Sequence, residues 1–210
     1  MSSSTSRHRL SAPPPVARQP IWTRDGELFA HELLYRAHDG SAVGVDLWHE
    51  DRQDRATASV LRALADGAPY LREGRAFVNV TRAFVVHDLP LPEPGDDLVL
   101  EVVESVPADA GVLSGLHALR AQGYQLAVDD FAAEAHQVAM LPYADFVKID
   151  CRELVRHGSA LIDMARQHDA LLVAERVSDA RLVETCLDLG FDLLQGDALG
   201  PATTLQPTDR

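Results

Sequence analysis

The sequence predicts one α/β domain of the (β/α)8-barrel type, in a compact version because 210 residues are few for a barrel. Eight short apolar or β-branched runs alternate with segments of helical periodicity, which is the pattern of parallel strands joined by helices. Six consecutive runs end in a carboxylate, amide or ammonium group. A doubly wound open sheet is the structural alternative, but no glycine-rich phosphate turn follows the first run.

The domain boundaries follow from composition. Residues 1–17 are rich in serine and then in proline and hold almost nothing to bury, so we expect a flexible tail. The barrel domain is expected over residues 18–203, and residues 204–210 form a short C-terminal tail. The two cysteines do not form a Cys-x-x-Cys motif, which indicates buried thiols rather than a disulfide framework.

The predicted strands are short runs of apolar or β-branched residues. They cover residues 21–23, 28–35, 76–80, 98–103, 126–129, 146–149, 171–174 and 193–195. Between them, the spacing of apolar residues predicts helices over residues 55–71, 112–121, 161–168 and 180–189. Gly123 and Gly190 are suited to end the second and fourth of these helices, and Asp179 is suited to cap the fourth at its N-terminus.

The net charge limits the partners of the protein. Lysine and arginine number 19 and aspartate and glutamate 32, which gives a formal net charge of −13. This charge repels nucleic acid backbones and anionic lipids, so we expect neither a nucleic acid duplex nor a membrane as partner. No apolar run approaches the roughly 18 residues that span a bilayer. The serine-rich N-terminus does not resemble a secretory signal, so a cytoplasmic location is expected.

The polar side chains at the strand ends are the main functional signal. In a parallel barrel, the carboxyl ends of all strands meet at one mouth, where the active sites of such barrels lie. Several carboxylates and an asparagine in one mouth would repel each other unless hard cations neutralise them, and oxygen-rich sites suit Mg²⁺ or Mn²⁺. A single acidic residue at a strand end often only meets water or caps a loop, but a whole series at matching ends favours a metal site.

The polar residues at the strand ends, in their order along the chain, resemble the motifs of EAL domains, the bacterial phosphodiesterase family that acts on cyclic di-GMP. The stretch Glu32-Leu-Leu-Tyr-Arg36 is similar to the E-x-L-x-R signature of that family. The resemblance covers about residues 18–201 and continues through Asn79, LEVVES with Glu101 and Glu104, DDF at 129–131, KID at 148–150, AER with Glu175 and QG with Gln195. The amino-acid sequence of these motifs is most similar to that of EAL domains fused to HDOD domains.

The resemblance implies a modified (β/α)8 TIM-type barrel that uses two divalent cations, Mg²⁺ or Mn²⁺, to open cyclic di-GMP to linear pGpG. Two cations can share the charge on the attacking and leaving oxygens and lower the pKa of a bound water. The residues that the resemblance assigns to one cation are Glu32, Asn79, Glu101 and Asp129. Asp129 would bridge to the second cation, which Asp130 would also bind.

The resemblance also implies roles around the cations. Lys148 would position the attacking water, and Glu175 would be the general base. Arg36 would contact a phosphate of the ligand. The other implied ligand contacts are Leu34 and Gln195, and Glu104 would steady the loop that follows the DDF motif.

Three departures from the family pattern predict weak or absent hydrolysis. The loop after the DDF motif, residues 132–136, reads AAEAH and lacks the two glycines of the family. Ser178 replaces the second glutamate of the family's E-G-V-E motif, and Arg176 replaces its glycine. Asp197 and Ala198 replace an aromatic pair, which removes stacking surface and adds negative charge. Each loss of a supporting group costs roughly 10–100-fold in activity or metal affinity.

Three functions therefore remain open: an active cyclic di-GMP phosphodiesterase, a receptor that binds cyclic di-GMP without hydrolysis, and a nucleotide-independent module that regulates an unidentified protein partner. The retained set of metal ligands argues against the third function. The sequence favours a degenerate EAL domain with weak or absent hydrolysis, for which binding of cyclic di-GMP or contact with a protein partner remains the open alternative. Because family dimers use the altered loop, we expect a monomer or an atypical homodimer.

Overall fold

The computed structural model describes residues 15–65 and 74–205, and the first 14 residues of the expected tail lie outside this range. Nine strands form one sheet. They are β1 (Val16–Thr23), β2 (Leu28–Tyr35), β3 (Arg75–Val80), β4 (Leu98–Val102), β5 (Gln125–Val128), β6 (Phe146–Asp150), β7 (Leu171–Glu175), β8 (Leu193–Gln195) and β9 (Thr203–Leu205). Strands β2 to β8 lie side by side in chain order and are parallel.

Strand β1 closes the barrel by pairing with both β2 and β8, and it runs antiparallel to each. The predicted barrel is therefore confirmed, but one of its strands is reversed. The reason is the connection between β1 and β2, which comprises only residues 24–27 and includes Gly26 at φ +79°. A parallel crossover needs a dozen or more residues, so this short turn can only form a hairpin.

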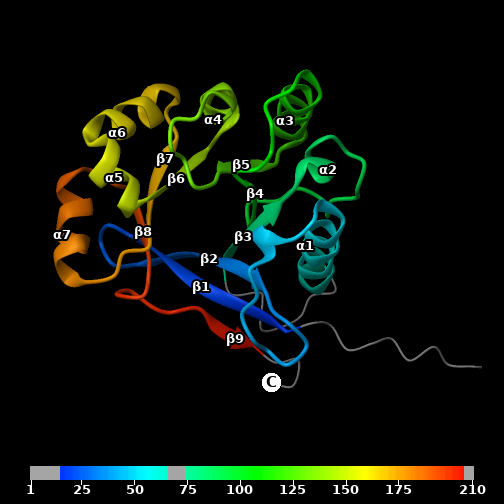
Figure 1. Ribbon diagram of the computed structural model, residues 1–210, viewed down its shortest axis with the longest axis horizontal. Helices are drawn as coiled ribbons and strands as arrows, with labels where there is room; N and C mark the ends of the chain where they lie inside the picture. The colour runs from blue at the N-terminus through cyan, green and yellow to red at the C-terminus, as the bar shows by residue number, and fades with distance from the viewer. Residues whose placement is uncertain (1–14, 66–73, 206–210) are drawn as a thin grey trace, which may run out of the picture.

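The helices cover the outside of the barrel. The α-helices are α1 (Glu50–Ala65), α2 (Arg82–Val85), α3 (Ala110–Gln122), α4 (Ala135–Met140), α5 (Cys151–His157), α6 (Ser159–Ala165) and α7 (Ala180–Asp188). Single 3-10 turns lie at η1 (Val45–Leu47), η3 (Leu141–Tyr143) and η4 (Arg166–His168). Figure 1 shows the helices following one another around the barrel from α1 to α7, whereas β1, β2 and β9 close the remaining side.

The three residues predicted to start or end helices, Asp179, Gly123 and Gly190, all lie at or within two residues of a helix end. Asp179 accepts a hydrogen bond from the Leu182 amide at the start of α7, and Gly123 ends α3 at φ +97°. Gly190 lies two residues beyond α7, at φ +84°. The helix predicted over 55–71 begins earlier, at Glu50, and its last predicted residues lie outside the described ranges.

Two ends of the chain differ from the expected boundaries. Val16 and Ala17, which we expected in the tail, are fully buried in β1. The expected C-terminal tail begins inside β9, which pairs antiparallel with Val16, Ala17 and Arg18 of β1. The first residues of β1 therefore pair with β9. The sequence does not predict β9, because a three-residue strand is too short to show an alternating pattern.

The interior of the barrel contains one apolar layer to which every barrel strand contributes one side chain. Its members are Ile21, Ala30, Phe77, Val99, Ala127, Phe146, Val173 and Leu193. A larger cluster lies outside the strands, where apolar residues of the sheet pack against the helices. The two cysteines belong to this outer cluster. Cys151 and Cys186 are buried free thiols, as predicted, and their sulfurs lie 3.4 Å apart.

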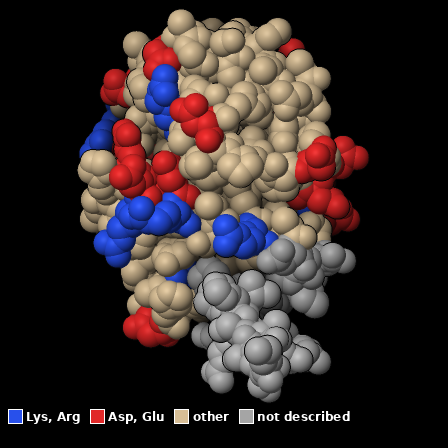
Figure 2. Space-filling view, turned by 90° about the vertical axis from the view of Figure 1, so that its right-hand side faces the viewer, with Lys and Arg blue, Asp and Glu red and all other residues tan. Residues whose placement is uncertain are grey.

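No helix in the described part of the chain is long and apolar enough to cross a membrane. Charged side chains of both signs lie on the surface. On the face seen in Figure 2, arginine side chains form a short band with acidic side chains beside it.

Candidate functional site

The candidate site is a second, polar layer in the barrel, directly above the apolar layer. Successive side chains of a strand point to opposite faces of the sheet, so every second residue points to the same face. In each parallel strand, a polar residue follows the member of the apolar layer by two positions, toward the carboxyl end of the strand. In β1, which runs the other way, the polar residue precedes Ile21 by two positions. These eight residues are Gln19, Glu32, Asn79, Glu101, Asp129, Lys148, Glu175 and Gln195.

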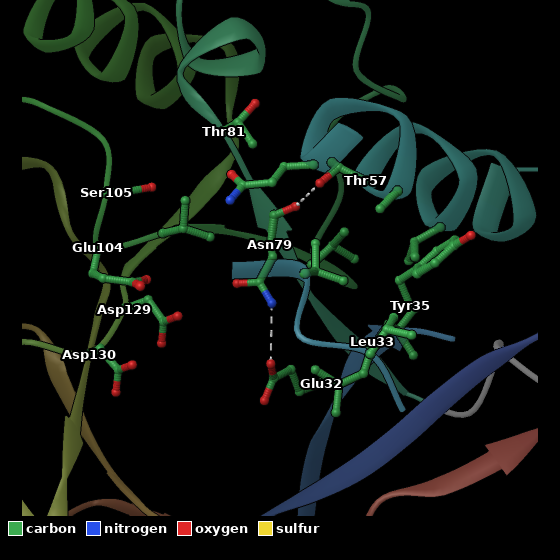
Figure 3. A pocket seen from close by; sticks show the side chains of 18 of the residues that line it. Glu32, Leu33, Tyr35, Thr57, Asn79, Thr81, Glu104, Ser105, Asp129 and Asp130 are labelled. Carbon is green, nitrogen blue, oxygen red and sulfur yellow. Dashed lines mark hydrogen bonds between the residues drawn. The ribbon is translucent and has the colours of Figure 1, made fainter. Parts of the chain in front are cut away.

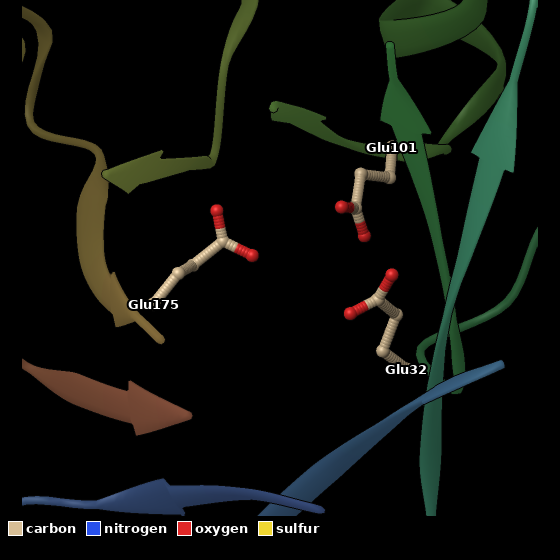
Figure 4. Close-up of side chains that lie close together, drawn as sticks. All are labelled: Glu32, Glu101 and Glu175. Carbon is tan, nitrogen blue, oxygen red and sulfur yellow. The ribbon is translucent and has the colours of Figure 1, made fainter. Parts of the chain in front are cut away.

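Lys148 lies at the centre of this polar layer. Its side chain is 1% exposed, and its Nζ contacts four carboxylates. The Nζ–oxygen distances are 2.7 Å to Glu175, 3.3 Å to Asp129 and 3.5 Å to Glu32, and Glu101 is also in direct contact. Figure 4 shows the carboxylates of Glu32, Glu101 and Glu175 pointing toward one another from different strands. The fold therefore gathers residues that are up to 143 positions apart.

Burial and crowding shift the ionisation of the polar layer. Burial raises the pKa of Glu175 to about 8, although Lys148 opposes this shift. Burial, followed by the charge of Asp129, also raises the pKa of Glu101 well above its ordinary value. Burial opposes the charge of Lys148, but the surrounding carboxylates outweigh it and raise the pKa of Lys148 well above its ordinary value. The site therefore holds more carboxyl groups than one ammonium can keep ionised.

Glu32 is held from both sides by amide groups. Gln195 donates from Nε2 to Glu32 Oε2 at 2.6 Å, and Asn79 donates from Nδ2 to Glu32 Oε1 at 3.3 Å. The backbone of Asn79 is tied in turn to α1, because the Thr57 hydroxyl donates to the Asn79 carbonyl at 2.9 Å. Figure 3 shows both hydrogen bonds of Asn79 within one pocket. Glu32 thus has a fixed orientation toward the centre of the barrel.

A second acidic cluster lies beside the first. One carboxylate oxygen each from Glu104, Asp129 and Asp130 lies within 4.8 Å of the others, as do oxygens from Glu32, Glu101 and Glu175 in the first cluster. Figure 3 shows Glu104, Asp129 and Asp130 together on one side of the pocket. Burial, followed by the charges of Asp129 and Glu104, raises the pKa of Asp130 to about 6. Glu104, expected to steady the loop, therefore brings its carboxylate to the two aspartates.

The donor set fits hard divalent cations. All candidate ligand atoms are carboxylate or amide oxygens, which Mg²⁺ and Mn²⁺ prefer. Asn79 Oδ1 and Glu101 Oε2 are buried and have no hydrogen-bond partner among the described residues. A buried oxygen without a partner is costly, and a cation in the polar layer would satisfy such atoms.

Two cavities open from the polar layer. One, of about 290 Å³, extends toward α1 and is lined by Arg36 together with apolar residues such as Tyr35 and Val60. The other, of about 500 Å³, extends toward the end of β8 and is lined by Gln195 and Asp197. The residues common to both are Glu32, Leu34, Asp129, Asp130 and Arg176. All three residues expected to contact the ligand, Leu34, Arg36 and Gln195, therefore line a cavity.

The replaced residues of the family pattern also lie at this mouth. Arg176 has φ +54°, which is unfavourable for a residue other than glycine, and its Nε lies 2.9 Å from Asp150 Oδ2. Arg152 binds the same carboxylate, with Nε 2.8 Å from Asp150 Oδ2. Ser178 is exposed at the cavity and donates to its neighbour Asp179 at 3.1 Å. The sequence alone does not show this two-arginine contact, because Arg176 lies 26 residues after Asp150 and meets it only in the folded barrel.

The chain resembles known proteins over most of its length. The sequence model of the EAL domain family matches residues 82–202, so Glu32 and Asn79 precede the matched segment. The uncharacterized protein YuxH of Bacillus subtilis is 30% identical over 189 residues, which cover 86% of this chain and 45% of YuxH. The cyclic di-GMP phosphodiesterase CdgJ of Vibrio cholerae is 32% identical over 192 residues, which cover 86% of this chain and 42% of CdgJ.

The chain thus spans less than half the length of these curated relatives. Two solved structures share the fold. The PaMucR phosphodiesterase in complex with c-di-GMP has a TM-score of 0.68 at 23% identity, over 91% of this chain and 97% of that one. BlrP1 of Klebsiella pneumoniae in complex with calcium and c-di-GMP has a TM-score of 0.72 at 22% identity, over 97% of this chain and 58% of that one. With the match to more than half of its residues, this chain belongs to the EAL domain family.

Proposed function

We propose that this domain binds cyclic di-GMP at the mouth of the barrel and hydrolyses it slowly to linear pGpG with the help of Mg²⁺ or Mn²⁺. The observation that carries the proposal is the polar layer, in which four carboxylates and three amides converge from different strands. Stability alone does not require so many buried carboxylates around one ammonium, because unpaired buried charge destabilises a fold. Relatives whose names include cyclic di-GMP phosphodiesterase support the substrate class.

The residues that would hold one cation are Glu32, Asn79, Glu101 and Asp129. Asp129 would also face a second cation together with Asp130, and Glu104 lies close enough to join them. Bound in this way, two cations would supply charge stabilisation to both oxygens of an in-line displacement and a more acidic water.

The remaining groups act on the water and the ligand. Glu175 would accept the proton of the attacking water, since its carboxylate points into the centre of the polar layer (Figure 4). The water oxygen bonds to phosphorus while the bond from phosphorus to the ribose 3′ oxygen breaks, and that oxygen leaves with a proton. Lys148, 2.7 Å from Glu175, would orient the water, and Arg36 would bind a phosphate at the edge of the smaller cavity.

The expected rate is low because the supporting groups differ from the family pattern. The Ser178 hydroxyl cannot replace a carboxylate as an acceptor with full negative charge. Asp197 lines the larger cavity and brings a negative charge to a place where an anionic ligand would lie. Both features leave the polar layer in place, so we expect slow turnover together with a weakened but retained hold on the substrate.

The test is incubation of the purified protein with cyclic di-GMP and Mn²⁺ or Mg²⁺, followed by separation of the products by chromatography. Glu175→Gln removes the proposed base with little change in volume, and Glu184→Gln makes the same change at an exposed position of α7. We expect pGpG from the unaltered protein and from Glu184→Gln but not from Glu175→Gln. Equal product from the two variants would contradict the role of Glu175.

Intact substrate after long incubation would instead favour a receptor, the second candidate, for which Ser178 and the glycine-free loop at 132–136 are the specific observations. Titration of cyclic di-GMP by calorimetry then separates a receptor from a nucleotide-independent module. Binding that is lost in Glu32→Ala would establish the receptor. Absence of binding to the unaltered protein would contradict both nucleotide-directed functions.

A further inference from the structure

We propose that Gln137 is a positioning residue that holds the loop of Asp129 and Asp130 in the shape needed to bind a cation, in place of the glycines that this loop lacks. The inference rests on the metal site proposed above, but not on any hydrolysis. Gln137 lies in the first turn of α4, eight residues after Asp129, and its side chain is only 3% exposed.

Four hydrogen bonds join the Gln137 amide group to this loop. Its Oε1 accepts from the amide of Ala132 at 2.9 Å and from that of Glu134 at 3.3 Å. Its Nε2 donates to the backbone carbonyl of Asp130 at 2.9 Å and to that of Asp129 at 3.3 Å. One buried side chain thus uses both its donor and its acceptor capacity on backbone groups of a single turn.

The loop needs such ties because its backbone is unfavourable. Asp130 has φ +43° and Ala133 has φ +61°, which place two residues other than glycine in the left-handed region. Such conformations persist only where the surrounding structure holds them. The four hydrogen bonds of Gln137 reach residues on both sides of these positions and tie the turn to α4, while the Phe131 amide donates to the Lys148 carbonyl at 2.8 Å.

The same loop is also fixed to the neighbouring strand end. His136 Nε2 lies 2.9 Å from the backbone carbonyl of Glu104, which directly connects α4 with the segment after β4. Gln137 and His136 together therefore set the relative positions of Glu104, Asp129 and Asp130. These three carboxylates form the second acidic cluster.

A purely structural explanation is that Gln137 only caps α4. Glu134 and Gln137 do form a capping box, in which the side chain of each residue meets the backbone amide of the other. A cap uses only the acceptor Oε1 of Gln137. The two hydrogen bonds from Nε2 to the aspartate carbonyls contribute nothing to a cap. A variant that loses only these donated hydrogen bonds therefore distinguishes a cap from a positioning residue.

The variants follow from this division. Gln137→Glu keeps the acceptor for Ala132 and Glu134 but, as a carboxylate, cannot donate to the aspartate carbonyls. Gln137→Met removes donor and acceptor at similar volume without adding charge. Gln125→Met makes the same change on β5, at the opposite end of the strand that leads into this loop, and serves as the matched control.

The experiment measures two quantities on the full chain: hydrogen–deuterium exchange of the amides at 132–134 without metal, and Mn²⁺ affinity by electron paramagnetic resonance. We expect faster exchange at 132–134 in Gln137→Met and a roughly 10–100-fold weaker Mn²⁺ affinity, as is typical when a supporting partner of ligands is lost. Gln137→Glu should keep the exchange protection and still bind Mn²⁺ more weakly. Gln125→Met should match the unaltered protein in both quantities.

Each contrary result has one meaning. Unchanged exchange in Gln137→Met would overturn the proposal, whatever the metal binding. Unaltered Mn²⁺ affinity in Gln137→Glu would reduce Gln137 to a helix cap and overturn its positioning role. If the unaltered protein binds no Mn²⁺ while the exchange protection depends on Gln137, the failure lies with the proposed metal site, and the role of Gln137 toward a cation is overturned with it.

Discussion

Lys148 Nζ lies 2.7 Å from Glu175 Oε1, on neighbouring strands and inside the barrel. Lys148 is the only lysine in the sequence, since every other basic position except the histidines is an arginine. An ammonium is a compact charge with three donors on a flexible stem, whereas a guanidinium is larger and planar. The one lysine is therefore placed where a small cation must reach four carboxylates at once.

Removing this ammonium should destabilise the protein without metal. Lys148→Met leaves four buried carboxylates without their counter-charge, and breaking a buried ion pair in this way costs about 3–5 kcal/mol. We expect that loss in the free energy of unfolding measured with urea. Mn²⁺ should restore part of it, because an ion that binds only the folded state stabilises that state.

The control for this prediction is Arg62→Met, which removes an exposed positive charge from α1. It should change the free energy of unfolding by much less than Lys148→Met. Equal stability of Lys148→Met and the unaltered protein, with and without Mn²⁺, would show that the carboxylates do not depend on Lys148.

Glu32→Ala should abolish metal-dependent binding of cyclic di-GMP. Glu32 is fixed by Gln195 and Asn79 and belongs to the first acidic cluster, so its loss removes an oriented oxygen rather than a surface charge. The Mn²⁺ affinity measured by calorimetry should fall by more than the roughly 10–100-fold that a supporting residue costs. Glu184→Ala, at an exposed site, should leave it unchanged. Retained Mn²⁺-dependent binding in Glu32→Ala would count against the proposed metal site.

Much of this fold could be predicted from the sequence because each barrel strand shows a short apolar run, and the residues at the strand ends repeat a polar pattern. An apolar interior residue and the polar residue two positions later point to the same face of a strand, as Phe77 and Asn79 do. The apolar run therefore predicts that the polar side chain also points into the barrel. The reversal of β1 was also readable, because only four residues separate it from β2. This signal is the number of residues between the two strands, not the periodicity of apolar residues within them.

Other features could not be read from the chain. Nothing in the local sequence of Gln137 distinguishes it from a surface glutamine, because its partners are backbone groups of a loop whose path depends on the fold. The left-handed conformations of Asp130, Ala133 and Arg176 are hidden for the same reason, since none is a glycine. The loop after the DDF motif keeps Asp130 and Ala133 in the left-handed region without a glycine, and hydrogen bonds from Gln137 hold it.

A close approach between the helices α2 and α3 predicts a steric effect. Gly115 lies in α3, and a Cβ at this position would lie 2.1 Å from the carbonyl oxygen of Val85 at the end of α2. Because that oxygen belongs to the backbone, it cannot rotate away, and Gly115→Ala must push α3 outward. We expect a loss of about 1–3 kcal/mol, the usual cost of overpacking, in thermal or urea unfolding. Gly95→Ala, where a Cβ has open space, should be nearly neutral; equal effects of both substitutions would contradict the close contact.

The last prediction concerns pH and the two arginines on Asp150. Burial raises the pKa of Asp150, but the hydrogen bonds of Arg152 and the charges of Arg152 and Arg176 outweigh it and lower this pKa below its ordinary value. A carboxyl group whose folded-state pKa is lowered stabilises the fold above the unfolded-state pKa and loses this contribution as the pH falls through the folded-state value. The contribution of Asp150 should therefore be complete near neutral pH and decline below about pH 4.

Asp150→Asn removes this dependence while keeping the size of the side chain. The difference in free energy of unfolding between the unaltered protein and Asp150→Asn should be constant from pH 7 to pH 5 and shrink as the pH falls further, because other carboxyl groups contribute equally to both proteins. Asp188→Asn, on the exposed surface of α7, should show no such pH-dependent difference. A difference that grew toward acid would mean that Asp150 is held protonated in the fold, which the contacts with Arg152 and Arg176 oppose.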